Sequence, residues 1–286
     1  MARIKWDEGG KRFYETGVKR GVLYVKDAET NKYGKGVAWN GLTSISESPS
    51  GAEETALYAD DIKYLSLRSV EELGLSIEAY TYPDEWAECD GTVAIGGGLM
   101  LGQQSRKYFG LSYRTQVGND ATADFGYKIH LIYNCSAAPS ERSYQTINDS
   151  PEAISFSWEV NTTTESLGSD AYKDASSVTI DTTKLTGGKT NAKLVSLEKA
   201  LYGQTKEAKS VKYEAASAVE DRTYYTSAAN AMSASSPVTN PVEGQTYYYV
   251  EGEETDPTLP ALKDVVALFN GDMTESAFEA AYCVAG

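Results

Sequence analysis

The sequence predicts a mainly β protein, a β-sandwich or barrel-like domain with one to three short peripheral helices. Stretches of alternating apolar and polar residues recur from about residue 18 to residue 181, as expected for strands that bury one face. The apolar content depends on tyrosine, with 21 residues, and on small or β-branched types that fit a pleated surface. Many alternating strands with few helices are typical of sandwiches and barrels.

We expect strands, in chain order, at 21–25, 35–46, 62–70, 73–82, 105–117, 124–133, 153–162 and 176–182. In 62–70 the apolar phase shifts between Tyr64 and Leu65, which indicates a bulge or a two-sided strand. The segments 105–117 and 124–133 alternate regularly on either side of the loop-like connector GNDATAD. These two segments therefore predict a β-hairpin.

Helices are expected at 83–91, 190–203 and 258–271. The first begins with proline and acidic residues, and the other two carry a leucine- or valine-rich stripe at helical spacing. Each segment ends at a glycine (Gly91, Gly203 and Gly271), the residue that most often ends a helix.

Two segments lack either pattern. Residues 47–61 are interpreted as an acidic loop, rich in turn formers, and a loop of this length is commonly functional. Residues 204–257, rich in Ser, Ala, Thr and Tyr, are interpreted as a surface insertion or a small appended hairpin. The expected organisation is a β domain over 1–203 with a long arm loop at 47–61, the insertion 204–257, and a C-terminal helix and tail over 258–286.

The charge balance excludes a protein that grips nucleic acid. The chain has 26 basic and 41 acidic side chains, a net charge of -15. Binding a duplex requires Lys and Arg to displace condensed counterions. An acidic surface instead repels phosphate, so DNA could slide past it without adhering.

The sequence offers no catalytic, cofactor-binding or metal-binding residues, and we expect no enzyme. His130 is the only histidine, and the three cysteines lie far apart. The segment GGKT (187–190) lacks the earlier glycine of a phosphate-binding loop and is interpreted as a turn before a helix. Adjacent carboxylates such as Glu53–Glu54 and Asp60–Asp61 are interpreted as solvated charge. No apolar stretch of signal-peptide length follows the basic N-terminal residues, and no apolar run approaches membrane-spanning length, so we expect folding in a reducing cytoplasm.

Several long runs together resemble one family. They are residues 35–69, 77–91, 102–120, 126–134, 148–160, 193–203 and 258–271. These runs resemble the major tail protein, the tail tube subunit, of long-tailed (siphovirus-type) bacteriophages and prophages of Gram-positive bacteria. The resemblance covers most of residues 3–203 in order, and the chain departs from it at 204–257.

The resemblance implies a phage tail tube fold that assembles into hexameric rings with a continuous inner β-barrel. The stacked rings would form the conduit for DNA ejection, within a virion tail assembled in the host cytoplasm. Implied partners are further copies of this chain, the tape measure protein, and the tail terminator and distal tail proteins. Double-stranded DNA would pass without specific binding, with no membrane and no cofactor involved. Strand spacing and tilt give such a barrel a bore of roughly 35–40 Å, wider than a duplex of about 20 Å.

The resemblance also implies that loop 47–61 is an arm that contacts a neighbouring subunit or ring. The contact residues expected on it are Pro49, Glu53, Glu54, Leu57, Tyr58, Asp60 and Asp61. We expect this loop to be mobile in the free subunit and to become ordered on polymerisation. Strands 36–46 and 62–70, with the hairpin 105–134, are expected to build the inner wall.

Two other classes of function stay open. One is a carbohydrate- or host-surface-binding β-sandwich of a phage tail or cell surface, with 204–257 as its recognition patch. The other is a hydrolase that uses paired acidic residues. Ring or tube formation separates the structural class from both, a glycan-binding screen tests the first alternative, and loss of a hydrolytic activity on Asp or Glu substitution would support the second.

Overall fold

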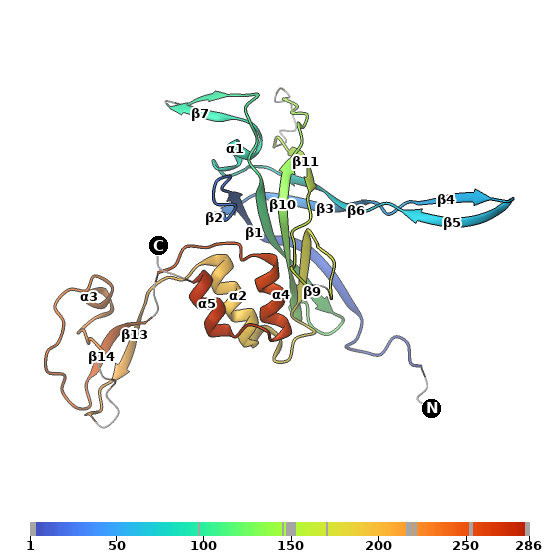
Figure 1. The fold of residues 1–286 in the computed structure, drawn as a ribbon. Coiled ribbons are helices and arrows are strands. Elements are labelled where there is room, and N and C mark those ends of the chain that lie inside the picture. Colours follow the sequence, from blue (N-terminus) through green and yellow to red (C-terminus); the bar gives the residue numbers. More distant parts are fainter. Residues whose placement is uncertain are drawn as a thin grey trace.

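A computed structural model describes residues 4–96, 98–144, 146, 153–169, 171–215, 219, 222–251 and 254–283. In this part of the chain an eight-stranded antiparallel sheet forms the body (Figure 1). Neighbouring strands follow the order β2-β1-β9-β10-β11-β6-β3, and β12 pairs with β10. The strands are β1 (Phe13–Lys26), β2 (Tyr33–Trp39), β3 (Leu42–Gly51), β6 (Glu71–Ala79), β9 (Phe109–Asn119), β10 (Gly126–Ala137), β11 (Phe156–Thr162) and β12 (Ser177–Asp181).

The sheet folds over on itself where β10 meets β11. These two strands share only three residue pairs, at Cys135–Ala137, whereas β10 pairs with β9 along most of its length. The strands β11, β6 and β3 therefore pack over β1, β9 and β10, and the helix α1 (Trp86–Cys89) closes one end. The core between the two halves is aromatic: the Trp86 ring contacts those of Trp39, Phe109 and Trp158, and Trp39 also contacts Trp158.

Three helices cover the other face of the β1–β9–β10–β12 half. They are α2 (Ala192–Tyr202), α4 (Leu262–Asn270) and α5 (Glu275–Tyr282). A second core cluster lies between them and the sheet, where Ile129, Leu131 and Tyr133 of β10 meet Leu197 and Leu201 of α2. The body thus has three layers, helices on sheet on sheet, and β9 and β10 are buried on both faces.

Three two-stranded sheets extend from this body in different directions (Figure 1). They are β4 (Glu54–Ala59) with β5 (Ile62–Arg68), β7 (Val93–Gly96) with β8 (Leu99–Leu101), and β13 (Glu207–Lys212) with β14 (Thr246–Glu251). The last pair is accompanied by the helix α3 (Ala228–Met232). A short 3-10 turn, η1 (Gly188–Thr190), precedes α2, as GGKT predicts.

The mainly β prediction is confirmed, with antiparallel sheets and few helices. The hairpin predicted at 105–133 is the pair β9–β10, and the three predicted helices are α1, α2 and α4. Gly203 and Gly271 end α2 and α4 with φ of 71° and 91°, values that glycine adopts without strain. The limit of three helices is wrong, because the described residues form five. The extra ones, α3 and α5, have five and eight residues and carry too short a periodic pattern.

The single strand predicted at 35–46 is also wrong. The chain turns at Asn40–Gly41, where Gly41 has φ of 79°, and separates β2 from β3. An Asn-Gly pair is the strongest short turn signal, and here it outweighs the continuous alternation around it. Strand β2 pairs with β1 and β3 pairs with β6, so these consecutive strands occupy opposite edges of the sheet.

The segment 204–257 forms a small unit around tyrosine rings. Tyr213, Tyr224 and Tyr247 contact one another at centroid separations of 5.4 to 6.3 Å. Within this segment, residues 216–218, 220–221 and 252–253 lie outside the described residues. No helix among the residues described here has both the length and the apolar character to cross a membrane.

Candidate self-assembly surfaces

The outer face of the β11–β6–β3 half is polar and has no positive charge. We call it the acidic sheet face, and it consists of Ser44, Ser46, Ser48, Gly74, Ser76, Glu78, Ser157, Glu159 and Asn161, which share one side of the ladder. None of the three strands contains Lys or Arg. Short serine side chains and two exposed carboxylates therefore define its chemistry.

Strand alternation explains why this face is polar. The residues between those of the acidic sheet face point inward, and Leu75, Ile77, Trp158 and Val160 are almost fully buried. Because successive side chains alternate across a strand, the intervening serines and glutamates must point out. Strand β3 is an edge of the sheet, so its outer row of backbone N–H and C=O groups is available to another chain.

The pair β4–β5 extends the β3–β6 pair into a long hairpin, which projects from the body in Figure 1. We call residues 52–69 the arm. Its ladder places Thr55 opposite Leu67, Leu57 opposite Leu65, and Ala59 opposite Ile62, so one face is apolar. This apolar face is exposed, with Ile62 at 63%. An isolated two-stranded hairpin is at best marginally stable in water, so the arm is a surface in need of a partner.

The other face of the arm carries an ion pair. The Glu54 carboxylate lies 2.5 Å from Lys63 Nζ and 3.7 Å from an Arg68 nitrogen. The Lys63 hydrogen bond is the main factor that holds the pKa of Glu54 below its usual value. At the tip, Asp60 and Asp61 have φ of 51° and 64°, the conformation of a two-residue hairpin turn that Asp tolerates well.

The arm corrects the expectation of an acidic loop at 47–61. Pro49 lies in β3, Glu54, Leu57 and Tyr58 lie on β4, and Asp60 and Asp61 form the tip, while Glu53 lies between β3 and β4. The segment is thus strand on both sides of a short interruption, already in the single chain. Both faces of a two-stranded hairpin can be exposed, so no buried periodicity appears in the sequence.

The sequence interpretation missed the contribution of β5 to the same face, from Ile62, Leu65 and Leu67. One signal was present. The ladder pairs Leu65 with Leu57 but Lys63 with Tyr58, which leaves Tyr64 as an extra residue. The predicted bulge at Tyr64–Leu65 is therefore confirmed, and it returns Ile62 to the apolar side.

The expected inner wall needs a correction as well. Strand β5 lies in the arm, and β9–β10 are covered by helices on one side and by β11–β6–β3 on the other. A strand buried on both faces cannot line a passage. Of the segments expected in the wall, only β3 presents an open sheet face.

The hairpin β7–β8 is a second exposed apolar element. Val93, Ile95, Leu99, Met100 and Leu101 are all exposed, and the sequence has no charged residue from 91 to 105. Such a patch marks an interaction surface more often than a free one.

A polar cluster fixes the root of the arm to the body. The Tyr113 hydroxyl donates to Glu47 of β3 at 2.5 Å, and the Tyr113 ring stacks on His130 at 4.6 Å. His130 Nε2 lies 3.0 Å from the Thr115 hydroxyl oxygen and 3.6 Å from a Glu15 oxygen. Burial lowers the pKa of His130, although both glutamates oppose this effect. The His130 side chain is only 13% exposed, so it belongs to the packed root of the arm.

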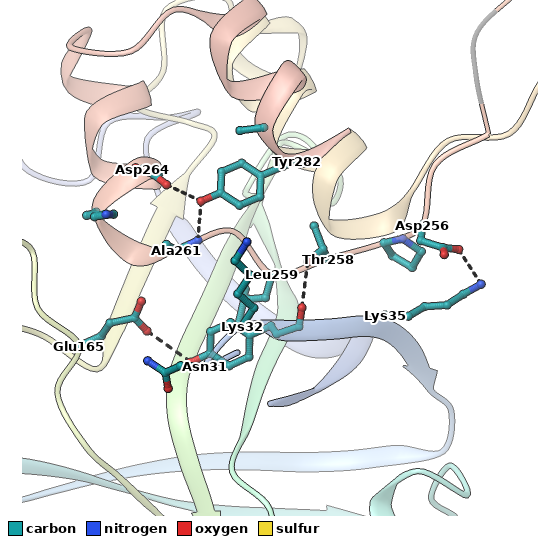
Figure 2. A pocket seen from close by; sticks show the side chains of 14 residues that line it. Asn31, Lys32, Lys35, Glu165, Asp256, Thr258, Leu259, Ala261, Asp264 and Tyr282 are labelled. Atoms are coloured by element: carbon teal, nitrogen blue, oxygen red, sulfur yellow. Dashed lines mark hydrogen bonds and ion pairs between the residues drawn. The ribbon is translucent and has the colours of Figure 1, made fainter. Parts of the chain in front are cut away.

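A cavity of about 630 Å³ opens beside the C-terminal helices (Figure 2). The Tyr33 hydroxyl donates to Glu165 at 3.3 Å, and the Tyr282 hydroxyl donates to Asp264. Burial is the main factor that raises the pKa of both tyrosines, so they stay neutral donors. The carboxylates are thereby satisfied, and no histidine, cysteine or serine is among the described residues that line the cavity.

The described residues assemble no group of three or more His, Cys, Asp or Glu side chains that could hold a metal ion. Cys89 and Cys135 are buried free thiols, and burial raises the pKa of Cys89 to about 12 and that of Cys135 further. Thiols in this state are poor nucleophiles at neutral pH.

These observations define a mainly antiparallel β protein with an open acidic sheet face and projecting apolar hairpins. No family model matches the chain, and no curated protein matches it. Among solved structures it is similar to a chain of an extracellular contractile injection system, the PVC sheath-tube complex in its extended state. The identity is 12%, the match covers 57% of this chain and 88% of that chain, and the TM-score is 0.26. A TM-score this low does not establish a shared fold or a shared role.

Proposed function

We propose that this protein is a structural subunit of a bacteriophage tail tube and polymerises as stacked hexameric rings around a passage for DNA. The observation that supports this most is the acidic sheet face, which combines an open polar surface with a free sheet edge. The resemblance to tail tube subunits points the same way. In this proposal the protein is a component of the virion tail and has no enzymatic activity.

The acidic sheet face suits the wall of a DNA conduit. Its strands offer no Lys or Arg to hold phosphate, and Glu78 and Glu159 repel it. Ser76 and Ser157 are small and uncharged, so they offer a passing duplex little to adhere to. A duplex would therefore pass without a preferred stopping position.

The sheet edges suit a ring. A strand with unpaired backbone groups is a template for pairing with another chain, and closure of a barrel removes such edges. Strand β3, at one end of the strand order, is available for this purpose, whereas β2 at the other end is partly covered, because the Gly36 N–H donates to the Pro257 carbonyl at 2.7 Å. Edge pairing between subunits would continue the acidic sheet face around the ring.

The arm suits contact between rings or subunits. Its apolar face is exposed along its length, whereas its root is held by Tyr113 and Glu47. Further partners, namely the tape measure protein and the tail terminator and distal tail proteins, belong to the same proposal.

The glycan-binding alternative receives no support from the segment 204–257. A sugar ring stacks on an exposed aromatic face. Tyr224, Tyr225 and Tyr247 are buried, and the rings of Tyr224 and Tyr247 contact Tyr213 and one another.

Negative-stain microscopy and sedimentation of the purified, concentrated protein test the proposal. We expect rings or tubes with a central channel. A protein that sediments as a monomer at every concentration would overturn it.

A cysteine-accessibility experiment tests the orientation of the wall separately. Ser76→Cys, in a chain with Cys283→Ala, should react with a bulky maleimide polymer as a monomer and be protected in tubes. Ser235→Cys in the 204–257 unit is the matched control and should react in both states. Equal reactivity of both positions in tubes would show that the acidic sheet face does not line the bore.

A further inference from the structure

We infer that the arm of one copy docks on the N-terminal segment of a second copy, residues 4–20, through opposite charges and matching apolar surfaces. This inference rests on the proposed function, because it names the surface that receives the arm during polymerisation.

The arm contributes negative charge beside an apolar face. The arm contains four carboxylates and two cations, Lys63 and Arg68, a net charge of -2. Glu54 is neutralised by Lys63, whereas Glu53, Asp60 and Asp61 are exposed beside the apolar residues Leu57 and Ile62. A partner for the arm should therefore offer cations together with exposed apolar side chains.

The N-terminal segment has that composition. Five cations lie within it, at Lys5, Lys11, Arg12, Lys19 and Arg20. It also exposes Trp6 at 77%, together with Ile4, Phe13 and Tyr14. Its three carboxylates are engaged in ion pairs, because Asp7 pairs with Arg12, Glu8 with Lys5 and Lys11, and Glu15 with Lys128 of β10. Five cations against three carboxylates still leave the segment with a net charge of +2.

The segment is held in a defined position. The Gly10 N–H donates to both oxygens of Asp120 at 2.9 and 3.0 Å, and the Asn119 amide donates to the Gly10 carbonyl at 2.9 Å. Phe13 packs on Phe125 with ring centroids 5.1 Å apart. These contacts anchor the segment to the β9–β10 turn while leaving its cations and Trp6 in solvent.

The two surfaces belong to different copies. In Figure 1 the arm and the N-terminal end leave the body separately, and no hydrogen bond or ion pair within the described residues joins 52–69 to 4–12. A contact between two different patches of one molecule is heterologous, so it can repeat from copy to copy without being used up, and it gives open growth where the rotation between copies does not close a ring. This geometry suits the stacking of rings.

A charge exchange tests the inference. The arm variant Glu53→Lys/Asp60→Asn/Asp61→Asn adds four positive charges and retains residues that tolerate the tip conformation. The N-terminal variant Lys11→Glu/Arg12→Glu lowers the net charge of the chain by the same amount. We expect each variant to raise the protein concentration needed for tube growth by roughly tenfold or more, as for a lost interfacial charge pair. We expect the two sets combined in one chain to restore growth to within about threefold of the parent.

The control Asp84→Lys/Glu85→Lys makes the same charge change on exposed residues away from both surfaces and should leave growth unaffected. Thermal unfolding of each monomer verifies folding. If the arm variant blocks growth but the N-terminal variant does not, or the combined chain fails to recover, the arm docks elsewhere, for example on β7–β8, and the inference is wrong. Absence of tubes from the parent chain would instead reject the proposed function.

Discussion

The hairpins β9–β10 and β4–β5 are both antiparallel pairs with short connections, yet one is buried on both faces and the other is exposed on both. The first lies between three helices and the β11–β6–β3 half of the sheet, and it contributes side chains to both core clusters. The second has an apolar face that meets only solvent in the single chain. The same local structure can thus serve folding in one place and association in another, depending on what covers it.

The difference predicts that substitutions in the body reduce the free energy of unfolding, whereas substitutions in the arm reduce assembly. The largest effect on unfolding is expected for Trp158→Ala in the inter-sheet core. Trp158 is 1% exposed and contacts Trp39 and Trp86, so its removal should cost about 3–5 kcal/mol. Urea denaturation measures this, and a cost below about 1 kcal/mol would show that the two sheet halves are not tightly packed.

A smaller loss is expected for Arg114→Ala on the helix side of β9. The Arg114 guanidinium pairs with Glu198 of α2 and lies 4.2 Å from the Tyr127 ring centroid. Because both groups are largely buried, removal of one should leave the other unpaired and cost about 1–3 kcal/mol. The double variant Arg114→Met/Glu198→Leu should recover much of that loss in the same measurement. Equal losses for single and double variants would contradict a role for the ion pair.

The free energy of unfolding should also depend on pH, through His130 at the root of the arm, and this effect is expected to be smaller than that of Arg114→Ala. The pKa of His130 is lowered by burial, despite Glu15 and Glu47 and with Lys128 adding to the decrease. The unfolded chain therefore binds the proton first, so stability is fully present above the usual histidine pKa of about 6.5 and decreases as the pH falls below it. Unfolding curves between pH 7 and pH 5 should show this decrease, and His130→Gln should reduce its slope. An unchanged slope would exclude His130 as its source.

The smallest effect on unfolding is expected for removal of the arm itself. Gly51 and Glu71 are directly paired, so residues 52–70 can be replaced by Asn-Gly without disturbing the β3–β6 ladder. We expect a change in unfolding free energy within about 0.5 kcal/mol, since surface elements contribute little. The shortened chain should fail to form tubes in electron micrographs. Normal tubes from this chain would remove the arm from the assembly interface.

The sequence predicted most of the body because burial there is periodic. The alternation in 105–133 and the leucine stripe of 190–203 report one buried face each, and both became the expected elements. The alternating pattern led to a wrong prediction at Asn40–Gly41, because β2 and β3 have similar patterns and only this turn separates them.

The candidate surfaces were harder to predict for a physical reason. A hairpin in solvent imposes no polarity on either face, so Glu54 and Leu57 gave no sign of being neighbours in a strand. The acidic sheet face was equally hidden, because Glu78 and Ser157 are far apart in sequence and meet only through the β6–β11 ladder. The bulge at Tyr64 was the exception, since a phase shift is visible within a few residues.

The corner at Asn40–Gly41 has a mechanical consequence. Trp39, at the end of β2, is buried among the core aromatic rings, and Leu42 begins β3, whose far end carries the arm. A force applied to the arm in an assembled filament would travel along β3 and reach the opposite border of the sheet within two residues. Tension between copies would thus be distributed over the aromatic core and would not act on a single edge strand alone.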